Sequence, residues 1–495
     1  PQSKIQNRKS EYGFIVASYD KTKDLIIDPL LASTYLGGTR GEEGSSLAID
    51  ASGNVYVTGC TSSSNFPTTI GVYDASYNGG ESDVFISKLN SGLTSLLAST
   101  YLGGTGWDDG CSLSLNYSAP YEVYVTGFTA SKNFPTTIGA YDTSYNGGGF
   151  YVGDIFVSRL DSALTSLEAS TYLGGSGSDM GNSINFNSSG SGTVYVTGYT
   201  TSKNFPTTSG AYDTTSNGGG SDAFVSKLNS GLTSLEASTF LGGSKGEEAT
   251  SIRTRGADVY LTGYTSSSNF PTTVGAYDTT YNSGKDAFVS KLNSGLTSLS
   301  ASTFLGGSKD DCASGLDSET IGVDIYIYLT GYTSSSNFPT TIGAYDTTYN
   351  GGYDVFVSKL DSGLTSLAAS TFLGGKANDC ATSLNTTGSA DVFVTGYTAS
   401  KDFPTTAGAS DTSYNGGKFD AFVSKLNSGL TGLTASTYLG GSGDDYGNSI
   451  DETTGSVYVT GYTYSKNFPT TIGALDTSYN GSCDAFVTRM DNSAL

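Results

Sequence analysis

The chain has no histidine among its 495 residues, and this absence narrows the chemistry open to it. Histidine is the usual general base near neutral pH, the commonest metal ligand and the usual pH switch, so mechanisms that depend on an imidazole are excluded. Basic residues are also few, since 24 Lys and Arg stand against 46 Asp and Glu, for a net charge of -22. Phosphate binding needs a basic surface, so we expect neither a nucleic-acid partner nor an anionic membrane surface.

Long apolar runs and paired cysteines are missing as well. No uninterrupted apolar run reaches the roughly 18 residues of a membrane-spanning helix, so we expect no membrane insertion. The five cysteines include no Cys-x-x-Cys pair, so a zinc site is not predicted. Cys312 and Cys380 occupy one register in successive repeats, which could bring them close together. We prefer the interpretation that the cysteines are free thiols filling small spaces.

A repeat of about 66 residues, present seven times, dominates the sequence. Each unit reads S-T-[YF]-L-G-G, an acidic loop, V-Y-V-T-G-Y-T, N-F-P-T-T, D-T-S-Y-N-G-G and D-A-F-V-S-K-L, with small changes. In the first unit we expect strands at residues 45–50, 54–61, 83–90 and 96–103, joined by glycine-containing turns. The second and third strands are apolar on both faces, so each sheet must be covered on both sides.

Four-stranded antiparallel sheets stacked face to face around an axis form a β-propeller. The last unit lacks a fourth strand, and residues 28–37 supply a fourth strand without a unit of its own. We therefore predict an all-β, seven-bladed β-propeller of four-stranded antiparallel blades, with the ring closed by an N-terminal strand that completes the last blade. We place the propeller at residues 25–495 and interpret residues 1–24, with a strand at 12–20, as the remnant of an upstream domain or a linker.

These motifs resemble the SBBP repeat family, the seven-bladed β-propeller repeats of bacterial and archaeal surface proteins. The matching elements are the L-G-G loop, G-N-V-Y-V-T-G at residues 53–59, N-F-P-T-T at residues 65–69 and G-x-Y-D…D-x-F-[IV]-S-K at residues 71–88. The resemblance covers residues 25–490 and recurs seven times. It implies an extracellular or cell-surface setting, often within longer multidomain proteins, and no defined activity.

The segment between the second and third strands contains the pattern D-x-[ST]-x-N, which suits a calcium loop. Oxygen ligands at its first, third and fifth positions, followed by a glycine turn, are how a calcium loop wraps its ion. We therefore predict calcium at Asp74, Ser76, Asn78, Asp142, Ser144, Asn146, Asp278, Asp346, Asp411 and Asp476. A further acid, such as Asp83, follows each loop and could complete the site. Alternatively, Asp and Asn form Asx turns and the later acid caps the third strand.

Two sets of charged residues also recur in every unit. The first is an acid four residues after L-G-G, which either rings one mouth of the central channel or, as we prefer, caps a turn: Glu42, Asp108, Asp179, Glu247, Asp311, Asp379 and Asp445. The second is a cation in the third strand, which we expect to pair with an acid of its own or the next blade: Lys88, Arg159, Lys227, Lys291, Lys359, Lys425 and Arg489.

Aromatic residues in the loops are candidates for contacting a ligand. Tyrosine beside Asp and Asn is typical of sugar-binding surfaces, where the ring stacks on the sugar and amides bond its hydroxyls. The alternative is a tyrosine packed on a neighbouring blade. The candidates are Tyr77, Tyr145, Tyr281, Tyr349, Tyr414 and Tyr479, together with Trp107, the single tryptophan.

An enzyme should break the symmetry of such a repeat in one place. Among the residues that differ from the repeat in single units, no nucleophile–base pair stands out. We therefore predict a protein that is not an enzyme. It would be an extracellular or cell-surface scaffold, stabilised by calcium, whose partners are other protein domains or copies of itself. The alternative is a multivalent glycan-binding or adhesion module that uses the tyrosine loops. A hydrolase or lyase that uses carboxylates alone is the third alternative.

Overall fold

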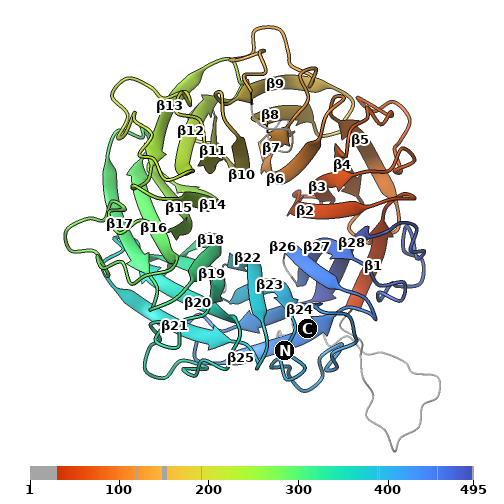
Figure 1. The fold of residues 1–495 in the computed structure, drawn as a ribbon. Coiled ribbons are helices and arrows are strands. Elements are labelled where there is room, and N and C mark those ends of the chain that lie inside the picture. Colours follow the sequence, from red (N-terminus) through yellow and green to blue (C-terminus); the bar gives the residue numbers. More distant parts are fainter. Residues whose placement is uncertain are drawn as a thin grey trace, which may run out of the picture.

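A computed structural model describes residues 30–118, 121–147, 153–190, 192–386, 388, 391–453 and 455–492. In it, seven four-stranded antiparallel sheets stand around a central axis (Figure 1). The prediction of an all-β, seven-bladed propeller is confirmed. The segment 1–24 and its expected strand at residues 12–20 lie outside the described residues. No helix in the described part is long and apolar enough to cross a membrane.

The strands follow one another in a fixed rhythm, and each group of four forms one blade. In chain order they are β1 Leu30–Leu36, β2 Glu42–Ile49, β3 Val55–Thr61, β4 Asp83–Leu89, β5 Leu96–Leu102, β6 Asp108–Asn116, β7 Glu122–Thr129, β8 Asp154–Asp161, β9 Leu167–Leu173, β10 Asp179–Asn187, β11 Thr193–Thr200, β12 Asp222–Asn229, β13 Leu235–Leu241, β14 Glu247–Arg255, β15 Asp258–Thr265, β16 Asp286–Asn293, β17 Leu299–Leu305, β18 Asp311–Ile321, β19 Asp324–Thr333, β20 Asp354–Asp361, β21 Leu367–Leu373, β22 Asp379–Thr386, β23 Val392–Thr398, β24 Asp420–Leu426, β25 Leu433–Leu439, β26 Asp445–Thr453, β27 Ser456–Thr463 and β28 Asp484–Asp491.

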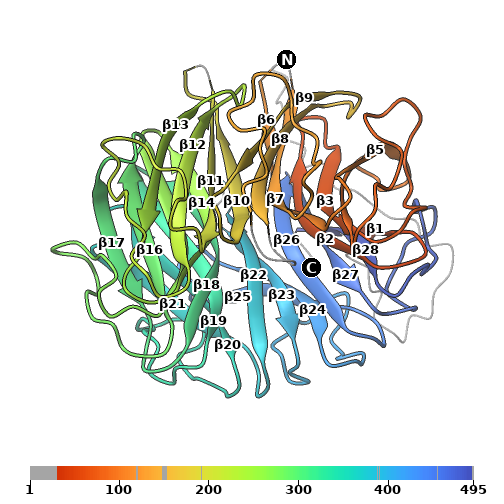
Figure 2. The same ribbon diagram turned by 45° about the horizontal axis from the view of Figure 1, so that its top comes forward.

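Blade 1 is the sheet β2-β3-β4-β5, blades 2 to 6 repeat it in chain order, and blade 7 is β26-β27-β28 with β1. The first strand of each blade lies nearest the axis and the fourth lies at the perimeter (Figures 1 and 2). In blade 7 the outer strand β1 pairs antiparallel with β28, from Leu30 opposite Met490 to Leu36 opposite Ala485. The N-terminal strand therefore closes the ring, as predicted.

The hydrophobic core is divided into seven clusters, and each cluster joins two neighbouring blades. The cluster between blades 1 and 2, for example, packs Val84 and Ile86 of β4 against Leu113 of β6 and Val125 of β7. The second and third strands are buried on both faces, which explains why their sequences lack alternation. All five cysteines are free thiols.

The outer strand of each blade is an edge strand, and the long loop between the second and third strands covers it. In blade 1 the Ser99 N–H donates to Thr69 Oγ1 at 3.1 Å, and the Tyr101 N–H donates to the Asp74 carbonyl at 3.0 Å. The same bonds recur in the other blades. The loop thus satisfies backbone groups that would otherwise invite pairing with another chain.

The inner strand is the opposite edge, and side chains of neighbouring blades satisfy it. Each inner strand contains a β-bulge, as between Gly44 and Ser46. Next to it, the Ser46 hydroxyl accepts a hydrogen bond from the Leu113 N–H of blade 2 at 3.3 Å. The bulged residue Thr250 donates in turn to the Ala313 carbonyl of the next blade at 2.9 Å. The repeated serines near the axis therefore join blades instead of standing free.

Six leucines occupy the left-handed backbone region in the turn between the third and outer strands. Their φ angles lie between 53° and 57°, an uncommon conformation for a branched side chain. Each leucine is fully buried, and its carbonyl accepts a loop N–H from the preceding blade, as Leu164 does from Tyr73 at 2.8 Å. Burial and this bond offset a strain of about 1 kcal/mol. They are Leu93, Leu164, Leu232, Leu296, Leu364 and Leu430.

Deletion of residues 30–36 tests the closure of the ring. Without β1, blade 7 has three strands and loses its pairing with β28, so we expect a lower melting temperature and a broader transition in scanning calorimetry. Removal of residues 1–24 alone is the control and should leave the transition unchanged, which also tests the predicted boundary at residue 25. Unchanged melting after loss of β1 would show that the ring does not depend on this strand.

Candidate functional site

The residues predicted to bind calcium form tight turns along the long loops. The Ser76 N–H donates to Asp74 Oδ1 and the Asn78 side-chain amide donates to Asp74 Oδ2, both at 2.8 Å. In each predicted loop the residue two positions after the first Asp donates its N–H in the same way: Ser76, Ser144, Thr280, Thr348, Ser413 and Ser478. Both oxygens of Asp74 are therefore engaged by N–H donors in an Asx turn. Calcium at Asp74, Asp142, Asp278, Asp346, Asp411 and Asp476 stays a prediction.

The loop tyrosines are half-buried and pack on their own blades. The Tyr77 ring stands edge-on to Tyr101 of the outer strand, with 6.1 Å between the ring centroids, and its hydroxyl donates to the Gly80 carbonyl at 2.9 Å. Edge-on or tilted contacts with the corresponding aromatic residue of the outer strand are made by Tyr145, Tyr281, Tyr349, Tyr414 and Tyr479. Much of each ring and, in five loops, the hydroxyl are thus used within the blade.

A groove between blades 1 and 2 brings together two residues of the predicted ligand set. Its volume is about 740 Å³, and Trp107 and Tyr145 line it with Glu81, Lys132 and Asn146. Trp107 packs edge-on against Phe128 at 5.3 Å. The Trp107 indole also hydrogen-bonds the half-buried Asp109 carboxyl, whose pKa is raised by partial burial. The groove combines aromatic faces with both charges and an amide.

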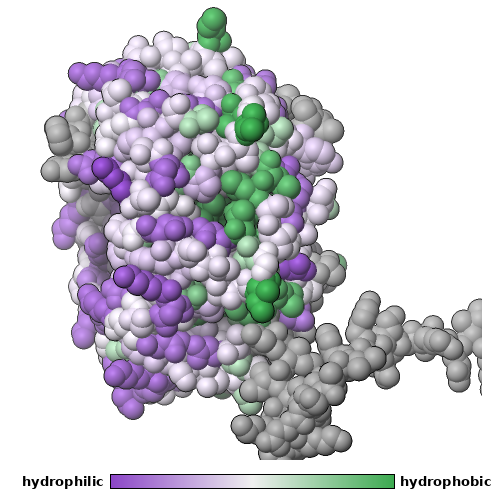
Figure 3. Space-filling view, turned by 90° about the vertical axis from the view of Figure 1, so that its right-hand side faces the viewer, coloured by the Kyte–Doolittle hydropathy of each residue, from purple (hydrophilic) through white to green (hydrophobic). Residues whose placement is uncertain are grey.

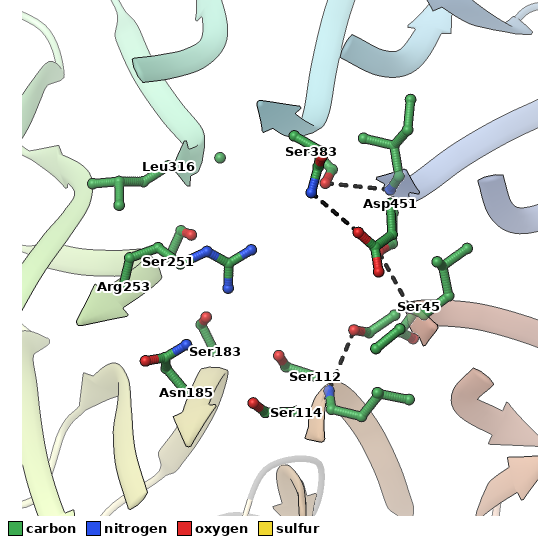
Figure 4. A pocket seen from close by; sticks show the side chains of 18 of the residues that line it. Ser45, Ser112, Ser114, Ser183, Asn185, Ser251, Arg253, Leu316, Ser383 and Asp451 are labelled. Atoms are coloured by element: carbon green, nitrogen blue, oxygen red, sulfur yellow. Dashed lines mark hydrogen bonds between the residues drawn. The ribbon is translucent and has the colours of Figure 1, made fainter. Parts of the chain in front are cut away.

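The central channel is a second cavity, of about 510 Å³, lined by all seven inner strands (Figure 4). Serines of several blades point into it, and Arg253 of β14 reaches inward from one side. The Arg253 Nε lies 3.5 Å from Oδ1 of Asp317 in β18, as an ion pair. Asp451 of β26 accepts a bond from the Asn385 side-chain amide at 3.1 Å, and burial raises its pKa to about 6. The sequence marked Arg253 as a departure from the repeat, but its place in the channel was not predicted.

Five of the seven cations of the third strands pair with an acid, as expected, whereas Lys359 and Arg489 make ring contacts and hydrogen bonds. Lys291 pairs with Asp258 at 2.8 Å and Lys425 with Asp391 at 3.0 Å, each within its own blade. Lys359 instead lies over the Tyr326 ring at 4.0 Å and donates to the Ser428 carbonyl of the next blade at 3.2 Å. These side chains join strands and blades.

The acids after L-G-G do not ring a mouth of the channel, because they are fully buried between blades. The expectation of capping is confirmed: Asp379 Oδ2 accepts the Gly375 N–H at 2.7 Å and the Ser400 hydroxyl at 2.8 Å, and Oδ1 accepts the Thr398 hydroxyl. A sequence pattern shows that an acid caps a turn but does not show whether the turn is buried.

Each of these acids lies beside the acid that begins the third strand of the preceding blade, and we call the two an acid pair. Around Gly374, a Cβ built on the glycine would lie 2.9 Å from Asp379 Oδ2 and 3.0 Å from Asp354 Oδ1. All fourteen side chains are buried. The pairs are Asp83/Asp108, Asp154/Asp179, Asp222/Glu247, Asp286/Asp311, Asp354/Asp379, Asp420/Asp445 and Asp484/Glu42.

The first acid of a pair is only half satisfied. Asp354 Oδ2 accepts the Asn350 N–H at 2.6 Å, whereas Oδ1 is buried without a hydrogen-bond partner. Burial, and next the neighbouring Asp379 and Asp346 carboxylates, raise the pKa of Asp354 to about 7 against the opposing bond from Asn350. Burial raises the pKa of Asp83, Asp154, Asp286 and Asp420 to about 7 as well.

Two segments match a family model described as a beta-propeller repeat, the SBBP model, at residues 33–67 and 436–469. The chain carries SBBP repeats. Each matched segment begins in an outer strand, β1 or β25, and runs through the inner two strands of the next blade. An SBBP repeat of this chain therefore spans a blade interface and contains the second acid of an acid pair.

Solved structures resemble the chain at low identity. They include hydrazine synthase of Kuenenia stuttgartiensis, at 9% identity over 89% of this chain and 96% of that chain with a TM-score of 0.46. The WD40 beta-propeller domain of Doa1 is 10% identical over 92% of this chain and 96% of that chain, with a TM-score of 0.45. A Dyadobacter fermentans protein of unknown function is 9% identical over 94% of this chain and 99% of that chain, with a TM-score of 0.43. No match was found among curated proteins.

The acid pairs predict a pH dependence of stability in buffer free of divalent cations. Because folding raises the pKa of Asp354 and its counterparts from about 4 to about 7, the folded state favours their protonated form. This stabilisation is complete below about pH 4 and is lost as the pH rises through 7, so the melting temperature should fall between pH 5 and pH 8.

The matched variants are Asp354→Asn and Asp346→Asn. Asparagine mimics the protonated acid, so the first change should reduce the fall in melting temperature from pH 5 to pH 8. The second alters a partly exposed turn in the same loop and removes a charge that contributes less than burial to the raised pKa of Asp354, so it should leave most of the fall in place. A melting temperature that is flat or rises over this range would contradict the prediction.

Proposed function

We propose that the chain is a non-enzymatic scaffold outside the cell or on its surface, and that it binds other protein domains or further copies of itself. The observation that carries this proposal is a set of aliphatic side chains at the tips of the long loops. Five of the seven tips expose Ile or Val completely, at 106% or 107% of the reference area: Ile70, Ile138, Val274, Ile342 and Ile472. Ser209 and Ala407 stand at the other two tips.

The position of these tips suits an interaction surface. The long loop lies outside the outer strand, since the Thr69 N–H donates to the Ser99 carbonyl at 3.2 Å, so its tip is at the perimeter. The side of the molecule drawn in Figure 3 shows one apolar patch near its middle and isolated apolar side chains above and below it, on an otherwise largely polar surface. Single exposed aliphatics are common, but one position repeated around a ring presents a regular set of contacts to a partner.

The departures from the repeat also favour a scaffold over an enzyme. Among the described residues Trp107 lines the groove between blades 1 and 2, whereas Arg253 lines the central channel. Catalysis needs a nucleophile, a base and stabilising donors gathered at one place. These departures lie in two different cavities. Trp107 bonds Asp109, which also accepts bonds from the Ser82 hydroxyl and the Cys60 thiol. Burial, however, raises the pKa of that thiol well above its usual value, which disfavours a nucleophilic thiolate.

Sedimentation velocity of the purified chain tests self-association. We expect a larger species to grow with protein concentration in the unaltered chain. A variant with Ser at positions 70, 138, 274, 342 and 472, made as Ile70→Ser and its counterparts, should remain monomeric because its tips match the natural Ser209. Its melting temperature should be unchanged, since these side chains touch no core. If the unaltered chain stays monomeric at high concentration, the proposal that it binds further copies of itself is contradicted.

A carbohydrate ligand is the second candidate, favoured by the groove that holds Trp107 and Tyr145. Tryptophan and tyrosine faces stack on sugar C–H groups, and Asn146, Glu81 and Lys132 supply polar partners for hydroxyls. Blade 2 combines the loop tyrosine with the chain's single tryptophan. This candidate therefore places one site in the groove instead of seven equivalent sites.

A glycan array run with and without calcium tests this candidate. Trp107→Ala should weaken any bound glycan about tenfold, as expected for loss of a stacking contact worth about 1.4 kcal/mol. Tyr349→Ala is the matched control, because it removes the same loop tyrosine from blade 5, where no tryptophan is present. Binding that is equally sensitive to both changes would contradict a single site in the groove.

A further inference from the structure

The acid pairs contain a feature that the packing of the blades does not explain. In six interfaces the first acid keeps a buried oxygen, Oδ1, without a hydrogen-bond partner. A buried charged oxygen without a partner costs several kcal/mol, and a second buried carboxylate beside it adds repulsion. The arrangement recurs at Asp83, Asp154, Asp222, Asp286, Asp354 and Asp420, so it is a property of the repeat.

We infer that each of these six acid pairs binds one calcium ion between two blades. At the interface of blades 5 and 6 the ligands of this chain would be Asp354 Oδ1, which has no partner, and the Asp379 carboxylate. This carboxylate would bind the ion in addition to its bonds from Gly375, Ser400 and Thr398. The interface of blades 7 and 1 is the exception. There Asp484 Oδ1 accepts the Gly481 N–H at 3.1 Å, so its oxygen is already used.

The first glycine of L-G-G leaves the space that such an ion requires. A Cβ on Gly174 would lie 2.8 Å from both Asp154 Oδ1 and Asp179 Oδ2, and a Cβ on Gly242 would lie 2.6 Å from Asp222 Oδ1 and 2.8 Å from Glu247 Oε2. Any side chain at these positions would therefore collide with two carboxylates. Glycine keeps both oxygens facing one small space, and this geometry recurs at Gly103, Gly306, Gly374 and Gly440.

The donors at the pair fit calcium better than other metals. Each pair presents carboxylate oxygens, which are hard ligands, and the chain has no histidine. A divalent cation also neutralises two like charges that are both withdrawn from water. Calcium takes six to eight oxygen ligands, so water or backbone carbonyls would supply the remainder.

This site differs from the one predicted from the loop pattern. Both oxygens of Asp346 already accept N–H donors, from Thr348 at 2.8 Å and Asn350 at 3.1 Å, whereas Asp354 Oδ1 accepts none. The two sites are nevertheless connected, because the Asn350 backbone N–H donates to Asp354 Oδ2. An ion at the acid pair would thereby hold the turn of the long loop, and the turn itself would need no ion. The inference does not depend on what the scaffold binds.

Terbium luminescence on the unaltered chain, stripped with chelator, tests the inference. Tyr349 and its counterparts lie near the acid pairs and can sensitise Tb³⁺. We expect emission that saturates near six ions per chain and is displaced by Ca²⁺. Decay rates in H₂O and D₂O should show an ion that has lost most of its water. Ca²⁺ should also raise the melting temperature at pH 8. Absence of saturable binding, together with a melting temperature indifferent to Ca²⁺, would overturn the inference.

Two triple variants locate the ion. Asp154→Asn, Asp286→Asn and Asp420→Asn together should reduce the number of bound Tb³⁺ ions from six to three. The matched set, Asp142→Asn, Asp278→Asn and Asp411→Asn, lies in the turns of the same loops and should keep six. The reverse result would overturn the inference and place the ion in the turns. If the first triple variant does not fold, Gly374→Ala alone should reduce the number to five, and six ions in that variant would contradict the site.

Discussion

A four-stranded blade has two edges, and the rest of this structure depends on how their backbone groups are satisfied. The outer edge is bonded by the long loop of the same blade, through Thr69 and the Asp74 carbonyl in blade 1. The inner edge is bonded by hydroxyls of adjacent blades, as Ser46 bonds the Leu113 N–H. Because the inner edge needs a neighbour, no blade is complete alone, and the ring must close through β1.

The same dependence explains why the repeat is so uniform. Core clusters, leucine turns and acid pairs all lie at blade interfaces, so every unit must present two matching faces. A change in one unit therefore disturbs the unit beside it, and the polar residues of the repeat cannot vary freely. Asp354 and Asp379 show this coupling: one begins a strand of blade 5, the other begins a strand of blade 6, and Gly374 separates them.

Much of the fold could be predicted from the sequence because burial leaves a clear pattern in strands. The apolar second and third strands predicted sheets covered on both faces, and the unpaired strand near residue 30 predicted the closed ring. The environment of individual side chains leaves a weaker pattern in the sequence than strand burial does. Nothing in the acid after L-G-G distinguishes an exposed cap from the buried Asp379, and nothing in D-S-G-L shows that Leu364 adopts a positive φ. The meeting of Trp107 with Tyr145 depends on two loops being adjacent in space, which spacing along one unit does not show.

Some residues of the repeat hold the ring together and others do not, and this difference indicates where binding can arise. Residue types that recur along the repeat are used to hold the ring, as the bonds of Tyr77, Lys359 and Asp379 show. A partner must therefore be met by groups that this network does not use. Two kinds qualify: loop tips such as Ile70, which project from the perimeter, and single departures such as Trp107 or Arg253, which line cavities. Tips repeat with the blades and suit extended contacts, whereas a departure occurs once and suits one small ligand. The first kind outnumbers the second, and for this reason the interaction scaffold takes precedence over the sugar-binding groove.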